Sequence, residues 1–359
     1  MKIWVRTLLG ATALGLLLSG PAASDPFKIG YIIPNAIGEA GWDHELERGR
    51  QAIVDHFGDK VQVNAVNGVG EGPDATRVMN RMAADGTNML ILGAFGLMND
   101  GLVLARRYPD LKVLHYGGYV NEPNFATLAL RHYEASYLCG MAAGMAAKTG
   151  NLGVVAAFPL PEVLSIMNAY VLGAQSVNPD IKPVKVVWLN SWFDPAKEKA
   201  AAESLASQGA EVLYSLFPGT PSTVSTAEQL GVYVTVTLSD NTMFAPTKHL
   251  CSAQAEFGPA LIRKIQDAID GKFVGDDTFS GVKDGSMGIA GLSPDLSEEQ
   301  KKQIMARLEE MRNGSFQPFR GPIMSNTGQE IAAEGTNLDD TAIKSMKFLV
   351  KGIDTTLPN

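Results

Sequence analysis

The chain has little of the chemistry that most enzymes and metalloproteins need. Only five histidines and two cysteines occur in 359 residues, and no histidines are paired at metal-ligand spacing. His44 and Glu45 begin a string like the zincin motif, but Arg48 stands where the second imidazole is required. The Gly-rich segment 68–72 is followed by proline and aspartate rather than by the Lys-Ser/Thr pair of a phosphate-binding loop, and no G-x-S-x-G string occurs. We therefore expect no catalytic residue, no metal and no cofactor.

The chain also lacks an apolar run long enough to cross a membrane. The uncharged segment 7–20 follows Lys2 and Arg6 and precedes small residues that end at Ser24, which is typical of a secretory signal peptide. The alternative is an N-terminal helix of the core. No cysteine lies nearby to carry a lipid. We expect residues 1–24 to be removed and the mature chain to be free in the periplasm.

The chain has fewer positively charged than negatively charged side chains. The formal net charge is −8, and it becomes −10 without Lys2 and Arg6. An acidic protein has no general attraction to nucleic acid or anionic lipid. The expected mature chain has a length that suggests about two domains.

The two cysteines, Cys139 and Cys251, lie far apart in the sequence. An exported protein can form a disulfide, but distant cysteines need not meet. Because Cys139 stands among small apolar residues, we favour two buried, unpaired side chains over a disulfide.

Apolar runs of strand length alternate with amphipathic helical patterns. We predict strands at 28–34, 61–66, 89–93, 112–116, 125–130, 152–156, 184–188, 212–215, 233–237 and 250–255. We predict helices at 42–57, 74–84, 133–148, 195–207, 258–269 and, from the capping box of Ser297 with Gln300, up to 313. This order indicates an α/β fold with parallel sheets, in which ligands bind beyond the carboxyl ends of the strands.

Aromatic side chains gather directly after the predicted strands, together with a few acids and amides. They are Trp42, Phe95, Tyr119, Phe158, Trp192 and Phe193. A flat apolar slot with few polar groups suits a planar, weakly charged ligand such as a heteroaromatic base. The alternative is that these rings plug the ends of the domains.

From about residue 28 to 358 the chain resembles the BMP (basic membrane protein) family of ABC-transporter substrate-binding proteins, which includes purine- and nucleoside-binding members. The segments that carry the resemblance are 38–50, 133–163, 168–179, 186–198, 288–296 and 319–323. It implies a type I periplasmic-binding-protein fold, with two Rossmann-like lobes joined by hinge strands. We expect lobe 1 to comprise 25–130 and about 257–325, and lobe 2 to comprise 131–256 and about 326–359.

The resemblance also implies the ligand contacts. Trp42 and Trp192 would stack on a base from opposite lobes, Asp43 would contact its edge, and Asp240 would hold ribose hydroxyls where a ribose is present. Three more residues fall on segments that line the family's pocket: Phe95, Phe158 and Asn168.

Two departures from the family pattern bear on the ligand. Nucleoside-binding relatives carry a lysine shortly after a Thr-Ser pair, whereas Cys251-Ser252 here leads to Gln254 and Glu256 without a lysine. Glu256 would accept a base N–H or lie on the surface. These differences favour a free nucleobase or similar heterocycle over a nucleoside.

We therefore expect a monomeric periplasmic receptor that binds a purine base and delivers it to an ABC permease in the inner membrane, with no nucleic-acid partner. The alternatives are a nucleoside receptor, a nucleoside-processing enzyme and a transcription regulator. The signal-peptide pattern and the missing basic helix-turn-helix argue against the regulator.

Overall fold

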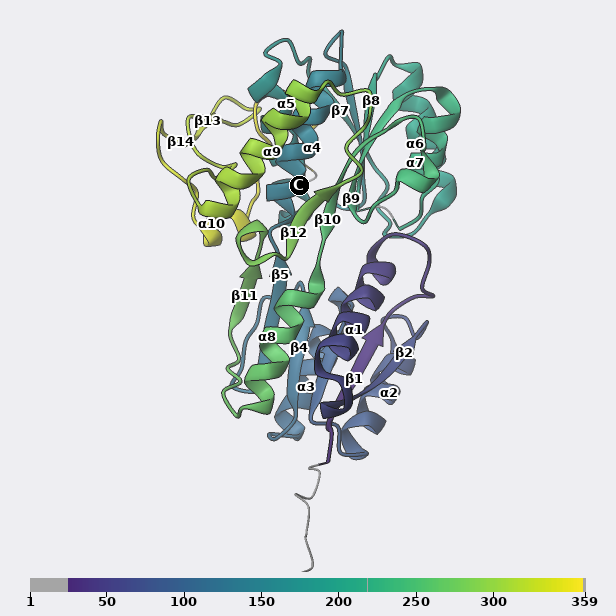
Figure 1. The fold of residues 1–359 in the computed structure, drawn as a ribbon, viewed down its shortest axis with the longest axis vertical. Helices are drawn as coiled ribbons and strands as arrows, with labels where there is room; N and C mark the ends of the chain where they lie inside the picture. The colour runs from purple at the N-terminus through teal and green to yellow at the C-terminus, as the bar shows by residue number, and fades with distance from the viewer. Residues whose placement is uncertain (1–24, 218, 358–359) are drawn as a thin grey trace, which may run out of the picture.

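The computed structural model describes residues 25–217 and 219–357, and it consists of two α/β lobes (Figure 1). The expected signal peptide lies outside the described residues. Within them, no helix combines the length and apolar character needed to cross a membrane.

The first lobe is built on a six-stranded parallel sheet in the order β11-β5-β4-β3-β1-β2. Its strands are β1 (Phe27–Ile33), β2 (Val61–Asn67), β3 (Met89–Leu92), β4 (Lys112–Tyr116), β5 (Phe125–Leu130) and β11 (Asp277–Ser280). Its helices are α1 (Trp42–Phe57), α2 (Pro73–Ala84), α3 (Met98–Arg107) and α8 (Phe257–Ile269).

Both faces of this sheet are buried. Tyr31 and Ile33 belong to the apolar cluster that includes Phe257 of α8, whereas Ile32 belongs to the cluster of α2 and α3. Successive side chains of a strand point to opposite faces, so one continuous apolar run serves both helical layers.

The second lobe is built on a seven-stranded sheet in the order β12-β10-β9-β8-β6-β7-β15. Its strands are β6 (Leu152–Ala156), β7 (Val184–Trp188), β8 (Val212–Leu216), β9 (Tyr233–Leu238), β10 (His249–Ala255), β12 (Met287–Ala290) and β15 (Ile353–Asp354), of which β12 alone is antiparallel to its neighbour. Its helices are α4 (His132–Ala146), α5 (Pro161–Val177), α6 (Pro195–Ser207), α7 (Ser222–Leu230), α9 (Glu298–Asn313) and α10 (Asp340–Lys344). A small hairpin of β13 (Ile323–Met324) and β14 (Glu330–Ala332) lies beside α10 (Figure 1).

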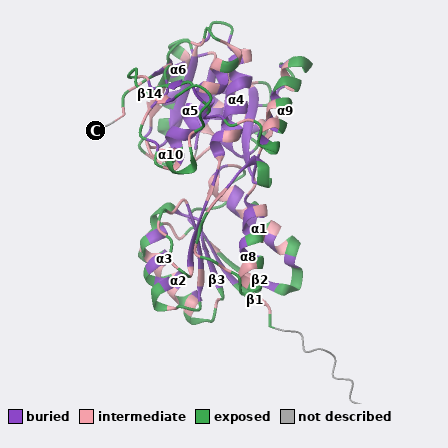
Figure 2. Ribbon diagram, turned by 90° about the vertical axis from the view of Figure 1, so that its left-hand side faces the viewer, coloured by how far each residue is buried: buried purple, intermediate pink, exposed green. Residues whose placement is uncertain are grey.

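Helices α4 and α5 are buried along most of their length and pack closely together (Figure 2). A side chain at Gly140 would collide with the backbone of Tyr170, and one at Gly173 would collide with the backbone of Tyr137. Glycine at these two crossing points allows the helix backbones to approach.

Helix α4 also packs against β10, and here Cys139 and Cys251 form a disulfide with their Cα atoms 5.3 Å apart. The expectation of two unpaired cysteines is therefore wrong. Of the small residues near Cys139, Gly140 and Gly144 allow α4 to pack against α5, and they do not indicate an isolated thiol.

Within the described residues, three segments connect the lobes: β5 to α4, β10 to α8, and β11 to β12. The expected type I periplasmic-binding fold is confirmed, but lobe membership differs in one stretch. Strand β12 pairs with β10, α9 packs on α4, and Phe316 and Phe319 contact aromatic rings of α4. Residues 287–325 therefore belong to the second lobe rather than the first. The chain returns to the second lobe directly after the short strand β11, which the apolar pattern did not reveal.

Candidate functional site

The carboxyl ends of the strands of both sheets face the junction between the lobes. Strand β5 ends where the chain enters α4 of the second lobe, and β10 ends where it enters α8 of the first. Because nearly all strands of each sheet run parallel, their other carboxyl ends lie at the same two edges. The two rows of strand-end loops therefore meet at the junction.

Exposed apolar side chains gather in these loops. In the first lobe they are Ile37, Phe95 and Tyr119, and in the second they are Trp192, Phe193 and Met243. Apolar groups exposed together at one edge are typical of a ligand-binding surface. Phe95 is 49% exposed, and its ring lies 6.4 Å from that of Tyr119.

Trp42 begins α1 and is anchored in the first lobe. Its indole Nε1 donates a hydrogen bond to the Gly93 carbonyl at 2.7 Å, beyond the end of β3. Its ring contacts Tyr116 and Phe257 edge to face, at centroid distances of 5.9 and 5.4 Å. An aromatic residue at this position therefore joins α1, the sheet and α8 while part of the ring stays accessible.

Asp43 is held by the strand-to-helix loop. Its two carboxylate oxygens accept hydrogen bonds from the Asn35 backbone N–H at 3.0 Å and from the Asn35 side chain at 3.1 Å. Burial raises the pKa of Asp43 above its usual value, although both hydrogen bonds favour the charged form. The side chain is thus positioned before any ligand arrives.

The second lobe contributes a ring cluster that reaches Trp42. Phe158 follows β6 and lies 4.9 Å from Trp192, which follows β7 and is 42% exposed. Among the described residues, no ring contact joins Trp42 directly to Trp192. Instead Phe217 lies 6.3 Å from Trp42 and 6.4 Å from Trp192.

Phe217 was missing from the residues inferred from the sequence, although the signal was available. It follows the strand predicted at 212–215, and the rule that selected the other strand-end aromatics applies to it equally. The expected pair of indoles thus becomes an aromatic series that runs from Trp42 through Phe217 to Trp192 and Phe158.

Unusual backbone geometry marks the same edge of the second sheet. The non-glycine residues with positive φ in the described chain are Asn190 after β7, Phe217 after β8 and Leu238 at the end of β9. Such a conformation costs roughly 1–2 kcal/mol per residue, and strain of this kind concentrates at functional sites. Phe217 is itself one of the strained residues. Asn190 lies two residues before Trp192, and Leu238 lies two residues before Asp240.

Asp240 is exposed and forms a local turn. Its Oδ1 accepts hydrogen bonds from the Thr242 N–H at 2.9 Å and from the Thr242 hydroxyl at 2.6 Å. Burial pushes the pKa of Asp240 upward, but the hydrogen bonds from Thr242 outweigh it and lower the pKa below its usual value. Its carboxylate is therefore charged at neutral pH.

Two of the expected site residues are engaged elsewhere. Asn168 is fully buried on α5; its side chain donates to the Phe348 carbonyl at 2.9 Å and accepts from the Val350 N–H at 3.0 Å. These bonds fix the C-terminal segment to α5, so the amide is not directed at a ligand as expected.

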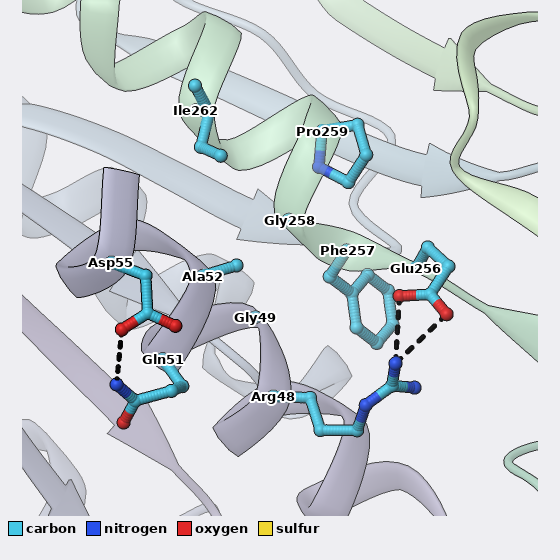
Figure 3. A pocket seen from close by; sticks show the side chains of 10 residues that line it. All are labelled: Arg48, Gly49, Gln51, Ala52, Asp55, Glu256, Phe257, Gly258, Pro259 and Ile262. Atoms are coloured by element: carbon cyan, nitrogen blue, oxygen red, sulfur yellow. Dashed lines mark hydrogen bonds and ion pairs between the residues drawn. The ribbon is translucent and has the colours of Figure 1, made fainter. Parts of the chain in front are cut away.

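Glu256 lies at a groove between α1 and α8, and Figure 3 shows its carboxylate paired with Arg48 at 3.0 Å through both oxygens. Of the two readings of Glu256 from the sequence, this arrangement matches the surface position.

Polar contacts also join the lobes. The Gly41 N–H donates to the Ser239 hydroxyl at 2.7 Å, and the Gln254 side chain donates to the buried carboxylate of Glu45 at 3.1 Å. Burial raises the pKa of Glu45 to about 7, against the lowering effects of Arg48 and Gln254. Glu45 is a further residue that the sequence did not single out, because its burial depends on the lobe-to-lobe contact.

The chain is similar to several binding proteins, including proteins of ABC transporters. The family model for Bmp, "ABC transporter substrate-binding protein PnrA-like", matches residues 27–317. A purine-binding protein of Brucella abortus is 34% identical over 349 residues, which cover 97% of this chain and 99% of the relative. A putative ABC transporter glucose-binding protein of Haloferax volcanii is 28% identical, with 95% of this chain and 83% of the relative covered. A nucleoside-binding protein of Lactococcus lactis is 27% identical over 41% of this chain and 42% of its own length.

Solved structures support the fold alone. A solute-binding protein of an ABC transporter from Aeropyrum pernix superposes with a TM-score of 0.68 at 17% identity, covering 85% of this chain and 95% of its own. A transcriptional activator from Bacillus halodurans superposes with a TM-score of 0.71 at 20% identity, covering 81% and 99%. With the family model matching most of its length, the chain belongs to the Bmp family of ABC transporter substrate-binding proteins, which are transport receptors rather than enzymes.

Proposed function

We propose that this receptor binds a purine nucleobase, or a similar planar heterocycle, between its two lobes. The observation that carries the proposal is the aromatic series from Trp42 through Phe217 to Trp192, which reaches from one lobe to the other at the strand-end loops. Aromatic side chains that line a site favour flat ligands, which can stack on them. The purine-binding relative from Brucella abortus supports the same ligand class.

Binding and lobe closure are coupled in this proposal. An open receptor admits the base to one lobe, and closure stacks it between Trp42 and Trp192 with Phe217 at the edge of the ring. Only a ligand that contacts both lobes stabilises the closed form. Each stacked aromatic pair adds about 0.5–1.5 kcal/mol beyond the burial of area. Asp43 orients the base by accepting from a ring N–H.

A nucleoside is the second candidate ligand, because Asp240 offers a charged carboxylate beside the site. Both of its hydrogen bonds from Thr242 end on Oδ1, which leaves Oδ2 for the hydroxyls of a sugar. The missing lysine after Ser252 favours the free base. The nucleoside-binding relative from Lactococcus lactis supports a nucleoside as the second candidate ligand.

The remaining partners follow from the family. A substrate-binding protein of an ABC transporter takes a small molecule and delivers it to a permease. We propose that this receptor acts as a monomer in the periplasm, after removal of the signal peptide, and that its loaded form docks on the permease of the inner membrane.

Isothermal titration calorimetry of the ligand-free protein with adenine, adenosine and glucose tests the proposal. We expect adenine to bind more tightly than adenosine and glucose not to bind. The Trp192→Ala variant should bind adenine at least about tenfold more weakly because it loses one stacking face. Val103→Ala is the control, since this side chain is 64% exposed on α3, away from the strand-end loops. Binding of glucose without binding of either purine would refute the proposed function.

A further inference from the structure

Phe217 is the one described residue whose ring contacts both indoles of the proposed site. Its side chain is only 8% exposed, although it stands in a loop at the end of β8. Besides Trp42 and Trp192, its ring contacts the imidazole of His132 at 5.2 Å. His132 is itself buried, and burial lowers its pKa to about 3, so this neighbour is neutral at physiological pH. The ring of Phe217 thus occupies an apolar position between the lobes.

The backbone at Phe217 is constrained. Phe217 has φ of 53°, and its N–H donates to the Thr237 hydroxyl at 2.7 Å. Two residues further on, a side chain at Gly219 would collide with the backbone of Trp192 and Phe193. The backbone at Gly219 and the loop that carries Trp192 are therefore packed against each other.

A ring buried against both indoles and His132 limits which ligand can lie between the indoles. A flat base that stacks between them meets the edge of Phe217 and gains an aromatic contact. A base that carries a bulky, non-planar substituent needs more room beside the stack. Because packed interiors do not deform continuously, the buried ring opposes such a ligand.

We propose that Phe217 is a specificity-determining residue that restricts the site to free planar bases and opposes their nucleosides. The inference rests on the proposed function and names the substrate class of the same site. Phe217 acts by occupying space between the lobes and not through a hydrogen bond.

The test is a comparison of two affinities in each variant, measured by calorimetry with adenine and with adenosine. In Phe217→Ala, adenine should bind more weakly because a ring contact is lost. The ratio of the adenosine to the adenine dissociation constant should fall at least about tenfold, because the space becomes free for the pentose. Phe217→Leu, which keeps most of the volume, should retain a ratio near that of the wild type, as should the Val103→Ala control on α3.

A merely structural role would weaken both ligands equally, so the ratio separates the two explanations. If Phe217→Ala does not fold, as judged by thermal unfolding, Phe217→Val provides the smaller side chain instead. An unchanged ratio, or a wild type that prefers adenosine, overturns the inference while leaving a purine receptor in place. A wild type that binds neither compound overturns the proposed function and this inference with it.

Discussion

At the scale of single residues, Asn168 shows how a polar side chain can carry a structural role within a segment typical of ligand pockets. Its amide joins α5 to the backbone of Phe348 and Val350. Removal of the amide leaves the buried N–H of Val350 and the part-buried carbonyl of Phe348 without this partner, and each such loss costs about 1–3 kcal/mol.

We therefore expect Asn168→Ala to lower the free energy of unfolding by about 2–4 kcal/mol in urea titrations. Adenine affinity, measured where the variant is folded, should stay within about twofold of wild type. Gln175→Ala is the matched control, because Gln175 also ties α5 to the C-terminal segment, at the Lys351 carbonyl, but in a more exposed place. A large loss of affinity with unchanged stability would show that Asn168 contacts the ligand after all.

At the scale of elements, the disulfide between Cys139 and Cys251 fastens the buried helix α4 to β10, a strand that leads to one of the lobe connections. It joins positions 112 residues apart in the sequence. A cross-link that closes so long a loop constrains the unfolded chain strongly.

The double variant Cys139→Ala/Cys251→Ala should lose about 2–4 kcal/mol of unfolding free energy relative to the oxidised protein. Wild-type protein treated with a reductant should show a similar loss, which controls for the substitutions themselves. Thiol titration of the unfolded, non-reduced wild type should find no free thiol. Two titratable thiols would contradict the disulfide.

At the scale of the whole molecule, Glu45 and Gln254 link the lobes through a buried carboxylate. Because burial raises the pKa of Glu45 from its usual value to about 7, the folded state binds a proton more tightly than the unfolded state. The contribution of Glu45 to the free energy of unfolding is therefore fully present below the usual pKa of 4.5. It is lost as the pH rises from there through the folded-state pKa of about 7.

Glu45→Gln should remove this dependence. Its unfolding free energy should exceed that of the wild type by an amount that grows between about pH 4.5 and 7 and reaches on the order of 1–3 kcal/mol. Unfolding midpoints in urea across this pH range measure the effect. Glu299→Gln, at an exposed position of α9, is the control. Parallel pH profiles for wild type and Glu45→Gln would contradict the assignment.

The predicted strands and helices agree with the structure within a few residues, because long apolar runs and capping residues are local signals. Strands β11, β12 and β15 have four residues or fewer and lie at or next to sheet edges, where no strong apolar run is required. Their absence from the predicted elements also explains the misplaced lobe boundary after Ser280.

The amino-acid sequence by itself determined the alternation of strands and helices, the two-lobe family and the aromatic residues that follow the strands. These features depend on local periodicity and on the rule for strand ends. The pairing of the cysteines, the structural role of Asn168 and the place of Phe217 between the indoles were decided only in the tertiary structure. Each depends on which distant segments are brought together, and contacts between segments leave no periodic trace in the chain.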